Sequence, residues 1–233
     1  MIRLFPEGFE ERDDAGALEL AAYTERPDAA SLLEGLGPVH ELEVVAGWED
    51  EWRRFHRPVR VGPLWIGPSW EAPAANATAV VVDPGRAFGT GAHATTRLCL
   101  ELLLDVDPTS LVDVGCGSGV IAVAAAKLGF TPVVALDNDE TAVETATTNA
   151  AVNQVDVDVR LCDILSEPLP PADVAVANIA LGPVEIAATR FSGRLLIASG
   201  YLEGERPAPS GWKVVERRTA EAWAADVLVR VGG

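Results

Sequence analysis

The chain has 233 residues and a formal net charge of −17 at pH 7. This charge argues against nucleic acid as a direct partner, because phosphate neutralisation supplies much of the affinity there. It favours a basic partner, although solubility alone would also explain it. Hydrophobic residues make up 48% of the chain, so a proper core is expected and disorder is not. No apolar run reaches the roughly 18 residues that a membrane helix needs. Three cysteines without metal-ligand spacing indicate a reducing cytoplasm and no metal site.

The first part of the chain is predicted to be a small α+β domain over residues 1–45. Its segments are a charged turn, a strand, a short helix and a second strand, at residues 10–15, 17–23, 27–34 and 39–45. Such a domain is too small to fold robustly alone. Aromatic side chains follow at Trp48, Trp52 and Phe55, with the i, i+4, i+7 spacing of one helix face. Residues 46–57 are therefore predicted to be a linker helix.

Residues 58–233 are predicted to form one α/β domain, because strand patterns alternate with helix patterns. The expected elements are a hairpin at 59–70, a buried strand at 79–83, five strands at 111–114, 132–136, 155–161, 172–178 and 194–199, and helices at 95–104, 120–128 and 140–151. A short loop at 180–183 leads to the fifth strand. Residues 212–217 and 225–231 are expected to pair as an antiparallel hairpin. Five β/α units and a hairpin predict a Rossmann-like, seven-stranded, mostly parallel sheet.

A glycine turn, Val112–Gly119, joins the first of these five strands to its helix. Glycines stand at the alternate positions Gly115, Gly117 and Gly119, where they allow positive φ and the close approach of a ligand. A dinucleotide fingerprint needs the spacing G-x-G-x-x-G, but Val120 occupies the place of its third glycine. This compact turn leaves less room for a pyrophosphate and suits a nucleoside that carries a small zwitterionic tail.

An acidic residue stands where a bound ribose would need one. Asp137 ends the second strand, at about the 20-residue spacing from the glycine turn that ribose-binding acids have in nucleotide folds. The pair of glycine turn and Asp137 predicts a nucleoside site. The alternative is a tight strand-to-helix turn that binds no ligand.

A second glycine-rich loop, Asp83–Thr96, opens the helix expected at 95–104. Helix N-termini present free N–H groups and a partial positive charge, and hydroxyls from Thr95 or Thr96 would add donors for a carboxylate. His93 in this loop is a candidate base, a ligand or a loop-packing residue. Metal binding by His93 is not expected, because no second histidine lies nearby in the sequence.

Two polar residues follow later strands, where ligands bind in parallel sheets. Asp163 comes after the third strand and would accept a hydrogen bond from an adenine amino group, or serve only as a cap or turn residue. Asn178 ends the fourth strand, which is otherwise apolar. It would face the ligand, the alternative being a turn residue.

These motifs, in this order, resemble a class I S-adenosylmethionine-dependent methyltransferase. The loop Asp83–Thr96 is more specific and resembles the signature of the bacterial ribosomal protein L-eleven methyltransferase family. Further pieces that are similar to this family are 48–52, 68–70, 113–119, 136–139 and 177–179. The resemblance covers roughly residues 46–205 and implies a class I methyltransferase fold with S-adenosylmethionine as the cofactor.

The resemblance also implies roles for site residues. Thr96 would hold the methionine end of the cofactor, Gly115 would let the backbone meet it, and Asp137 would take the ribose hydroxyls. Gly117, in the same glycine turn, is a further expected cofactor contact. Asn178 would lie beside the methyl donor and orient an amine. Apart from the resemblance, His93 is the nearby candidate for a proton acceptor, so the expected catalytic residues are Asn178 and His93.

The expected reaction is N-methylation of lysine side chains or the N-terminal amine of ribosomal protein L-eleven, by a cytoplasmic monomer that binds neither nucleic acid nor a membrane. Residues 1–45 look shorter than the family's substrate-recognition domain, so the target stays open. One alternative is a methyltransferase of the same fold that acts on another lysine-bearing protein or a small amine. A second is a non-catalytic module that binds the cofactor. A third is a nicotinamide-dependent oxidoreductase, against which the valine at position 120 argues.

Overall fold

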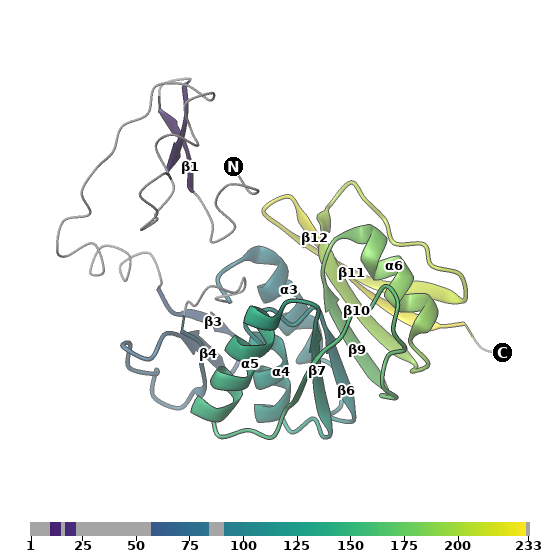
Figure 1. Ribbon diagram of the computed structural model, residues 1–233, viewed down its shortest axis with the longest axis horizontal. Coiled ribbons are helices and arrows are strands. Elements are labelled where there is room, and N and C mark those ends of the chain that lie inside the picture. Colours follow the sequence, from purple (N-terminus) through teal and green to yellow (C-terminus); the bar gives the residue numbers. More distant parts are fainter. Residues whose placement is uncertain (1–9, 15–16, 22–56, 84–90, 232–233) are drawn as a thin grey trace. The chain divides into compact units, whose positions relative to one another are not determined.

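The computed structural model describes residues 10–14, 17–21, 57–83 and 91–231. The chain divides into two compact units, Met1–Trp52 and Arg53–Gly233 (Figure 1). The helix expected at 27–34, the strand at 39–45 and nearly all of the linker at 46–57 lie outside the described residues.

The first unit contains an antiparallel pair of strands, β1 (Glu10–Asp14) and β2 (Ala17–Ala21). The strand predicted around β2 is confirmed. The turn predicted at 10–15 is wrong, because its charged residues form β1. Strand formation depends more on a pairing partner than on the intrinsic preference of each residue, and β2 supplies that partner.

The second unit is built on a seven-stranded sheet, as predicted. Its strands are β6 (Leu111–Val114), β7 (Val133–Asp137), β8 (Asp158–Leu161), β9 (Val174–Asn178), β10 (Leu195–Leu202), β11 (Trp212–Ala220) and β12 (Trp223–Arg230). They lie in the order β11-β12-β10-β9-β6-β7-β8. Five strands that are adjacent in the sheet are parallel, namely β10, β9, β6, β7 and β8. Strand β12 runs antiparallel to both of its neighbours, β10 and β11. The predicted terminal hairpin is the pair β11 and β12.

The helices of this unit are α3 (Ala94–Leu103), α4 (Val120–Lys127), α5 (Glu140–Val152) and α6 (Leu181–Arg190). The first three are confirmed. The loop expected at 180–183 is wrong, because α6 begins there. Gly182 and Pro183 indicate a loop in the sequence, but proline is tolerated in the first turn of a helix, where its missing N–H is not needed. The regular series of five β/α units is also wrong, since the chain makes only turns at 162–173, between β8 and β9.

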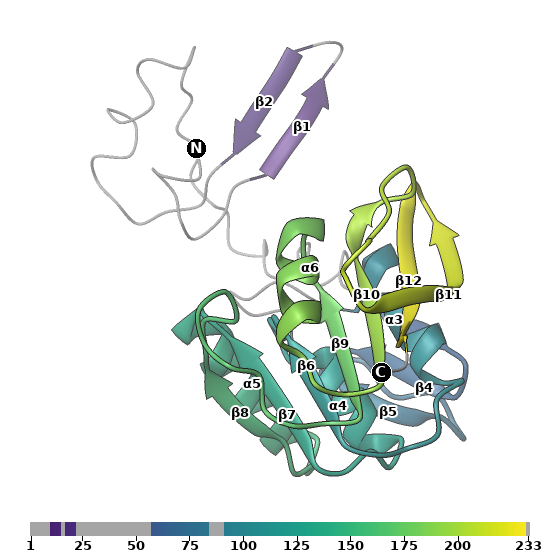
Figure 2. The same ribbon diagram turned by 90° about the vertical axis from the view of Figure 1, so that its right-hand side faces the viewer.

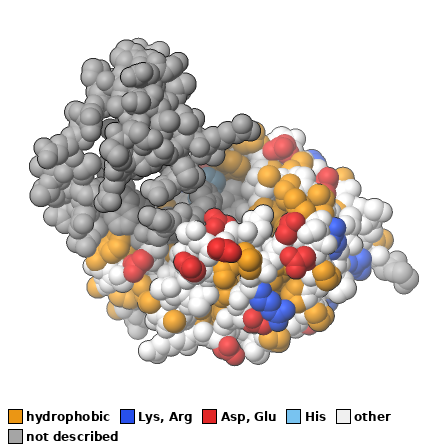
Figure 3. Space-filling view, in the orientation of Figure 1, with side chains coloured by type: hydrophobic (Ala, Val, Ile, Leu, Met, Phe, Trp, Pro, Cys, Tyr) orange, Lys and Arg blue, Asp and Glu red, His pale blue; other side chains and the backbone are white. Residues whose placement is uncertain are grey.

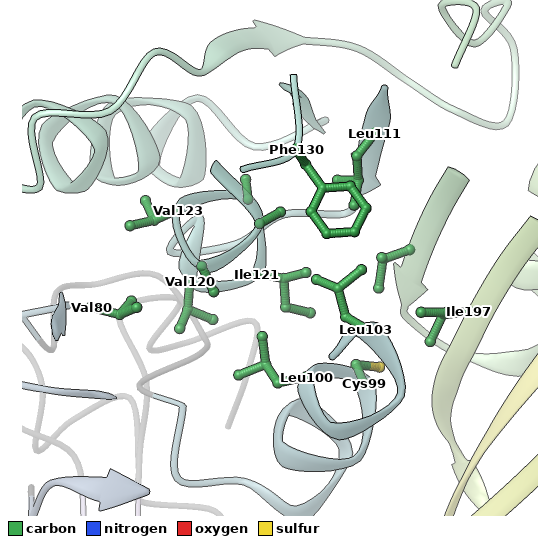
Figure 4. Close-up of a cluster of buried hydrophobic side chains, with 14 of the residues drawn as sticks. Val80, Cys99, Leu100, Leu103, Leu111, Val120, Ile121, Val123, Phe130 and Ile197 are labelled. Atoms are coloured by element: carbon green, nitrogen blue, oxygen red, sulfur yellow. The ribbon is translucent and has the colours of Figure 1, made fainter. Parts of the chain in front are cut away.

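Side chains alternate between the two faces of the sheet, and each face has its own hydrophobic core. On one face Leu111, Val133 and Val176 pack with α3, α4 and α5. On the other face Val112 and Val134 pack with α6. Figures 1 and 2 show the helices in layers over the sheet. Figure 4 shows the first core, where side chains from α3 and α4 meet those of the strands.

A small three-stranded sheet precedes the large one. Its strands are β3 (Val59–Val61), β4 (Leu64–Gly67) and β5 (Thr78–Val81), and the predicted hairpin is the antiparallel pair β3 and β4. At the end of α5, Asn153 holds β5 through both backbone groups of Val81. Asn153 Oδ1 accepts from the Val81 N–H at 2.9 Å, and Asn153 Nδ2 donates to the Val81 carbonyl at 2.6 Å. Among the described residues, no helix is both long and apolar enough to cross a bilayer.

Candidate active site

A cavity of about 330 Å³ lies at the carboxyl ends of the central parallel strands. From β6 the chain proceeds to β7 and β8 on one side and returns to β9 and β10 on the other. Open α/β sheets bind ligands at such a switch point. The predicted site residues that line the cavity are Thr96, Gly115, Gly117, Asp137 and Asn178.

The glycine turn is tied to the end of β7. The N–H groups of Gly115 and Cys116 both donate to the carbonyl of Leu136, at 2.8 and 2.9 Å. Gly115 has a φ of 72°, and a Cβ added there would lie 2.4 Å from Cγ2 of Ile179. Glycine is therefore required at this position both by backbone conformation and by the close approach of Ile179.

Asp137 holds the turn with its side chain while it lines the cavity. Its Oδ2 accepts from the Gly117 N–H at 2.8 Å, and its Oδ1 accepts from the Asp139 N–H at 3.1 Å. Each carboxylate oxygen has a further lone pair. Asp137 is thus placed to accept hydrogen bonds from a ribose as well, which stays a prediction.

Asn178 and Thr96 meet at the cavity, although they lie 82 residues apart in the sequence. Asn178 is the last residue of β9, and Thr96 lies in the first turn of α3. Asn178 Nδ2 is 3.3 Å from Thr96 Oγ1 and donates to it. This contact orients the amide so that Asn178 Oδ1 is left as an acceptor. The sequence predicts both residues individually, but not their contact.

His93 caps α3 and is not among the residues that line the cavity. Its Nδ1 lies 2.8 Å from Thr95 Oγ1 and accepts from the Thr95 N–H at 3.4 Å. The ring packs edge-on against Trp223, with 5.0 Å between the ring centroids. Of the three roles that the sequence leaves open, this geometry supports loop packing.

Asp163 also lies outside the lining of the cavity. Its carboxylate accepts from the Leu165 N–H at 3.0 Å and from the Ser166 hydroxyl at 2.8 Å. These bonds, the hydroxyl first, lower the pKa of Asp163. The structure thus favours the turn role over the adenine contact. Its neighbours Ile164 and Leu165 line the cavity instead. The sequence does not mark them, because apolar loop residues have no distinctive pattern.

A buried carboxylate lies within the stretch Val112–Gly119, in the strand that leads to the three glycines. Asp113 in β6 is 1% exposed, and its Oδ2 accepts from the Ala122 N–H in the first turn of α4 at 3.0 Å. Burial raises the pKa of Asp113 from 3.8 to about 7. The sequence carries a signal for this residue, a single acid within the apolar strand Leu111–Val114.

Replacing Asp113 with asparagine is expected to change how stability depends on pH. Because the folded-state pKa lies above the unfolded value, the folded protein binds more protons between about pH 4 and pH 7, so this group lowers the free energy of unfolding as pH rises. Asparagine can still accept from Ala122 but does not titrate. The free energy of unfolding of the variant, minus that of the wild type, should therefore increase from pH 4 to pH 8. The expected increase is a few kcal/mol, at roughly 1.4 kcal/mol per pKa unit. Urea unfolding at both pH values measures this. A stability difference between variant and wild type that is the same at pH 4 and at pH 8 would contradict it.

Comparison with known proteins identifies the family. A family model described as ribosomal protein L11 methyltransferase (PrmA) matches residues 19–230 of the chain. The chain belongs to this family. A ribosomal protein L11 methyltransferase from Exiguobacterium sibiricum is 34% identical over 259 residues, which cover 95% of this chain and 81% of the relative. One from an Enterobacter species is 40% identical over 201 residues, which cover 79% and 69%. The crystal structure of a ribosomal protein L11 methylase from Lactobacillus delbrueckii subsp. bulgaricus superposes with a TM-score of 0.67 at 28% identity, covering 75% of this chain and 99% of that one.

The chain is therefore a methyltransferase with S-adenosylmethionine as its methyl donor, and the predicted fold class, enzyme class and cofactor are confirmed. The non-catalytic and nicotinamide alternatives are set aside. The cavity of this methyltransferase fits the donor. Asp137 offers acceptors for a ribose, and Ile164 and Leu165 offer apolar walls for a base. The described residues of the lining include no Lys, Arg or His, as suits a ligand without phosphates.

Proposed function

We propose that this enzyme N-methylates lysine side chains, the N-terminal amine, or both, of ribosomal protein L11. The observation that carries the proposal is the pair Asn178 and Thr96, which presents a fixed amide oxygen at the cavity. An amide oxygen accepts a hydrogen bond without titrating, so it suits the orientation of an amine. The names of the relatives supply the target.

The main task of the protein in this reaction is to position the two reactants. When bound, S-adenosylmethionine supplies a methyl group on a sulfonium, which passes to a neutral amine while the carbon–sulfur bond breaks and the amine loses a proton. Holding both partners at attack distance contributes about 7–11 kcal/mol to such a reaction. Asp137 and the glycine turn would hold the nucleoside, and Asn178 Oδ1 would accept from an amine N–H.

The acceptor amine must be neutral, whereas an exposed lysine has a pKa of about 10.4. Burial of the amine against the apolar side chains of the cavity, including Ile179 and Pro183, disfavours its charged form and lowers its pKa. We assign the proton to solvent, because His93 is committed to the cap of α3.

The charge of the enzyme fits a basic protein substrate. The net charge is −17, and acidic side chains are spread over the face shown in Figure 3, where basic side chains are fewer. Complementary charge speeds the encounter of two proteins. In this proposal residues 1–45 form the part that recognises the substrate, and the cytoplasm remains the predicted location.

The test is mass spectrometry of purified ribosomal protein L11 after incubation with the enzyme and S-adenosylmethionine. We expect mass gains in steps of one methyl group, and fragmentation assigns them to amines. At a donor concentration near the wild-type dissociation constant, the Asp137→Ala variant should give almost no gain. Asp139→Ala, two residues away and outside the cavity lining, should act like the wild type. If the enzyme bound S-adenosylmethionine but gave no mass gain, its target would be another lysine-bearing protein or a small amine.

A further inference from the structure

The carboxyl end of β10 contains a backbone bulge beside Asn178. Ser199 is paired with Asn178 across the parallel strands, and the pairing with β12 shifts register between Ser199 and Tyr201. Gly200, at the shift, has a φ of +96°. A Cβ at Gly200 would lie 2.2 Å from the Ile179 carbonyl oxygen and 2.6 Å from its carbon. The bulge therefore contacts the backbone of the residue that directly follows Asn178.

Buried hydrogen bonds anchor the bulge on both sides of Gly200. Before it, the Ser199 hydroxyl donates to the Ala224 carbonyl at 2.7 Å. After it, the Tyr201 oxygen lies 2.8 Å from Oδ2 of Asp226, within donating distance. Ser199 and Asp226 are fully buried, and Tyr201 is 2% exposed. Side chains that are held in this way leave the bulge little freedom to move.

Arg217 in β11 extends the anchor to the segment that follows β10. Its Nη1 lies 3.1 Å from Asp226 Oδ2, and its Nη2 donates to the carbonyls of Glu203 and Glu205 at 2.9 and 2.8 Å. A buried ion pair is a poor source of stability, because the desolvation of both charges offsets their attraction. The ion pair of Arg217 and Asp226 therefore serves chiefly to hold the backbone after β10 in one defined position.

Ile179 is enclosed from two directions. Its carbonyl faces Gly200, and its Cγ2 fills the space where a side chain on Gly115 would begin. Atoms in such close contact transmit a displacement to their neighbours. A shift of the bulge would therefore move Ile179 and, one residue before it, Asn178.

We propose that Gly200 is a positioning residue for methyl transfer. The anchored bulge fixes the Asn178–Ile179 backbone, and through it the amide that orients the acceptor amine. The inference rests on the proposed role of Asn178. Gly200 itself is not among the residues that line the cavity, so it acts through the backbone that it contacts.

The test compares two glycine-to-alanine changes that share the strain of positive φ. Gly200→Ala adds a Cβ against Ile179, whereas Gly211→Ala, with a φ of +80°, adds a Cβ that has no neighbour within 4 Å. We expect Gly200→Ala to lower kcat on ribosomal protein L11 by about 100-fold, the cost of a misplacement near 1 Å. The dissociation constant of S-adenosylmethionine should change much less than kcat. Gly211→Ala should leave both within about threefold of the wild type, since it carries only the conformational strain.

Equal effects of the two variants, or a loss of donor affinity as large as the loss of kcat, would overturn the proposal. Tyr201→Phe is the second variant, in case Gly200→Ala does not fold. It removes the hydroxyl that anchors the bulge and keeps the ring. We expect kcat to fall by about tenfold, because the loosened bulge positions Asn178 less well.

A readout without substrate separates this inference from the proposed function. The side-chain amide resonance of Asn178, assigned by its absence in Asn178→Asp, should shift in Gly200→Ala or Tyr201→Phe and stay in place in Gly211→Ala. An unmoved resonance in the first two variants overturns the inference, whatever the activity. If the wild type did not methylate ribosomal protein L11 but the Asn178 resonance shifted in the first two variants, the inference would stand. That result would count against ribosomal protein L11 as the target.

Discussion

Replacing Asp137 with alanine is expected to weaken the binding of S-adenosylmethionine by about 100-fold or more. The carboxylate would accept from two ribose hydroxyls, and each charge-assisted hydrogen bond contributes about 1.5–3 kcal/mol. The same change removes the acceptors of the Gly117 and Asp139 N–H groups. Of its ties to β7, the glycine turn then keeps its backbone bonds to the Leu136 carbonyl. Isothermal titration calorimetry with S-adenosylmethionine measures the change in affinity directly.

Two further variants separate the ribose contact from the support of the turn. Asp137→Asn keeps the shape and one acceptor oxygen but loses the charge, so an intermediate affinity is expected. Asp139→Ala removes the cap of α5, where Oδ1 accepts from the Thr141 N–H at 2.8 Å. It should cost about 1 kcal/mol of stability and leave the donor affinity unchanged. If Asp139→Ala weakened donor binding as much as Asp137→Ala, the ribose contact would be ruled out as the cause.

The fold could be predicted from local patterns wherever one pattern dominates. The glycine turn between an apolar strand and an alanine-rich helix defines β6 and α4, and both occur at the expected residues. The sequence misleads where one residue type has two uses. Pro183 is typical of a loop and also of a first helical turn, and α6 was missed for that reason. Charged residues 10–14 are typical of a turn, yet they form β1 because β2 pairs with them.

The site could be predicted only as separate residues. Asp137 and Asn178 stand at strand ends, and this position alone places them at the cavity. His93 and Asp163 are polar residues in the correct region, but local capping bonds occupy them. A sequence pattern does not distinguish a polar side chain that caps its own turn from one that faces a ligand, because both occur after strands and before helices.

The buried ionisable residues show a deeper limit of the sequence. Arg217 and Asp226 lie in strands whose polar residues would ordinarily face solvent, and nothing nearby in the sequence marks them as partners. Their burial follows from the pairing of β12 between β10 and β11, which is a property of the whole sheet. The contact of Gly200 with Ile179 has the same origin.

Replacing Asn178 with alanine is expected to lower kcat by about 100-fold, since the acceptor amine loses the group that orients it. Donor affinity should change by only a few-fold, because the nucleoside contacts of Asp137 remain. Steady-state kinetics on ribosomal protein L11, together with calorimetry of donor binding, provide the comparison. A parallel loss of donor affinity and kcat would show that Asn178 acts mainly in holding the donor.

The Asn178→Asp variant tests the orientation of the amine by a change in pH dependence. It keeps an acceptor oxygen near Thr96 but adds a negative charge beside the acceptor amine. A nearby carboxylate stabilises the ammonium form and raises the pKa of the amine, so a smaller neutral fraction is present at a given pH. The rising limb of kcat against pH should therefore move upward by about one unit, within the one to three units that an adjacent opposite charge produces. Thr96→Ser, which keeps the hydroxyl that accepts from Asn178, should leave the limb in place. An Asn178→Asp profile that coincides with that of the wild type would mean that the amine does not approach this side chain.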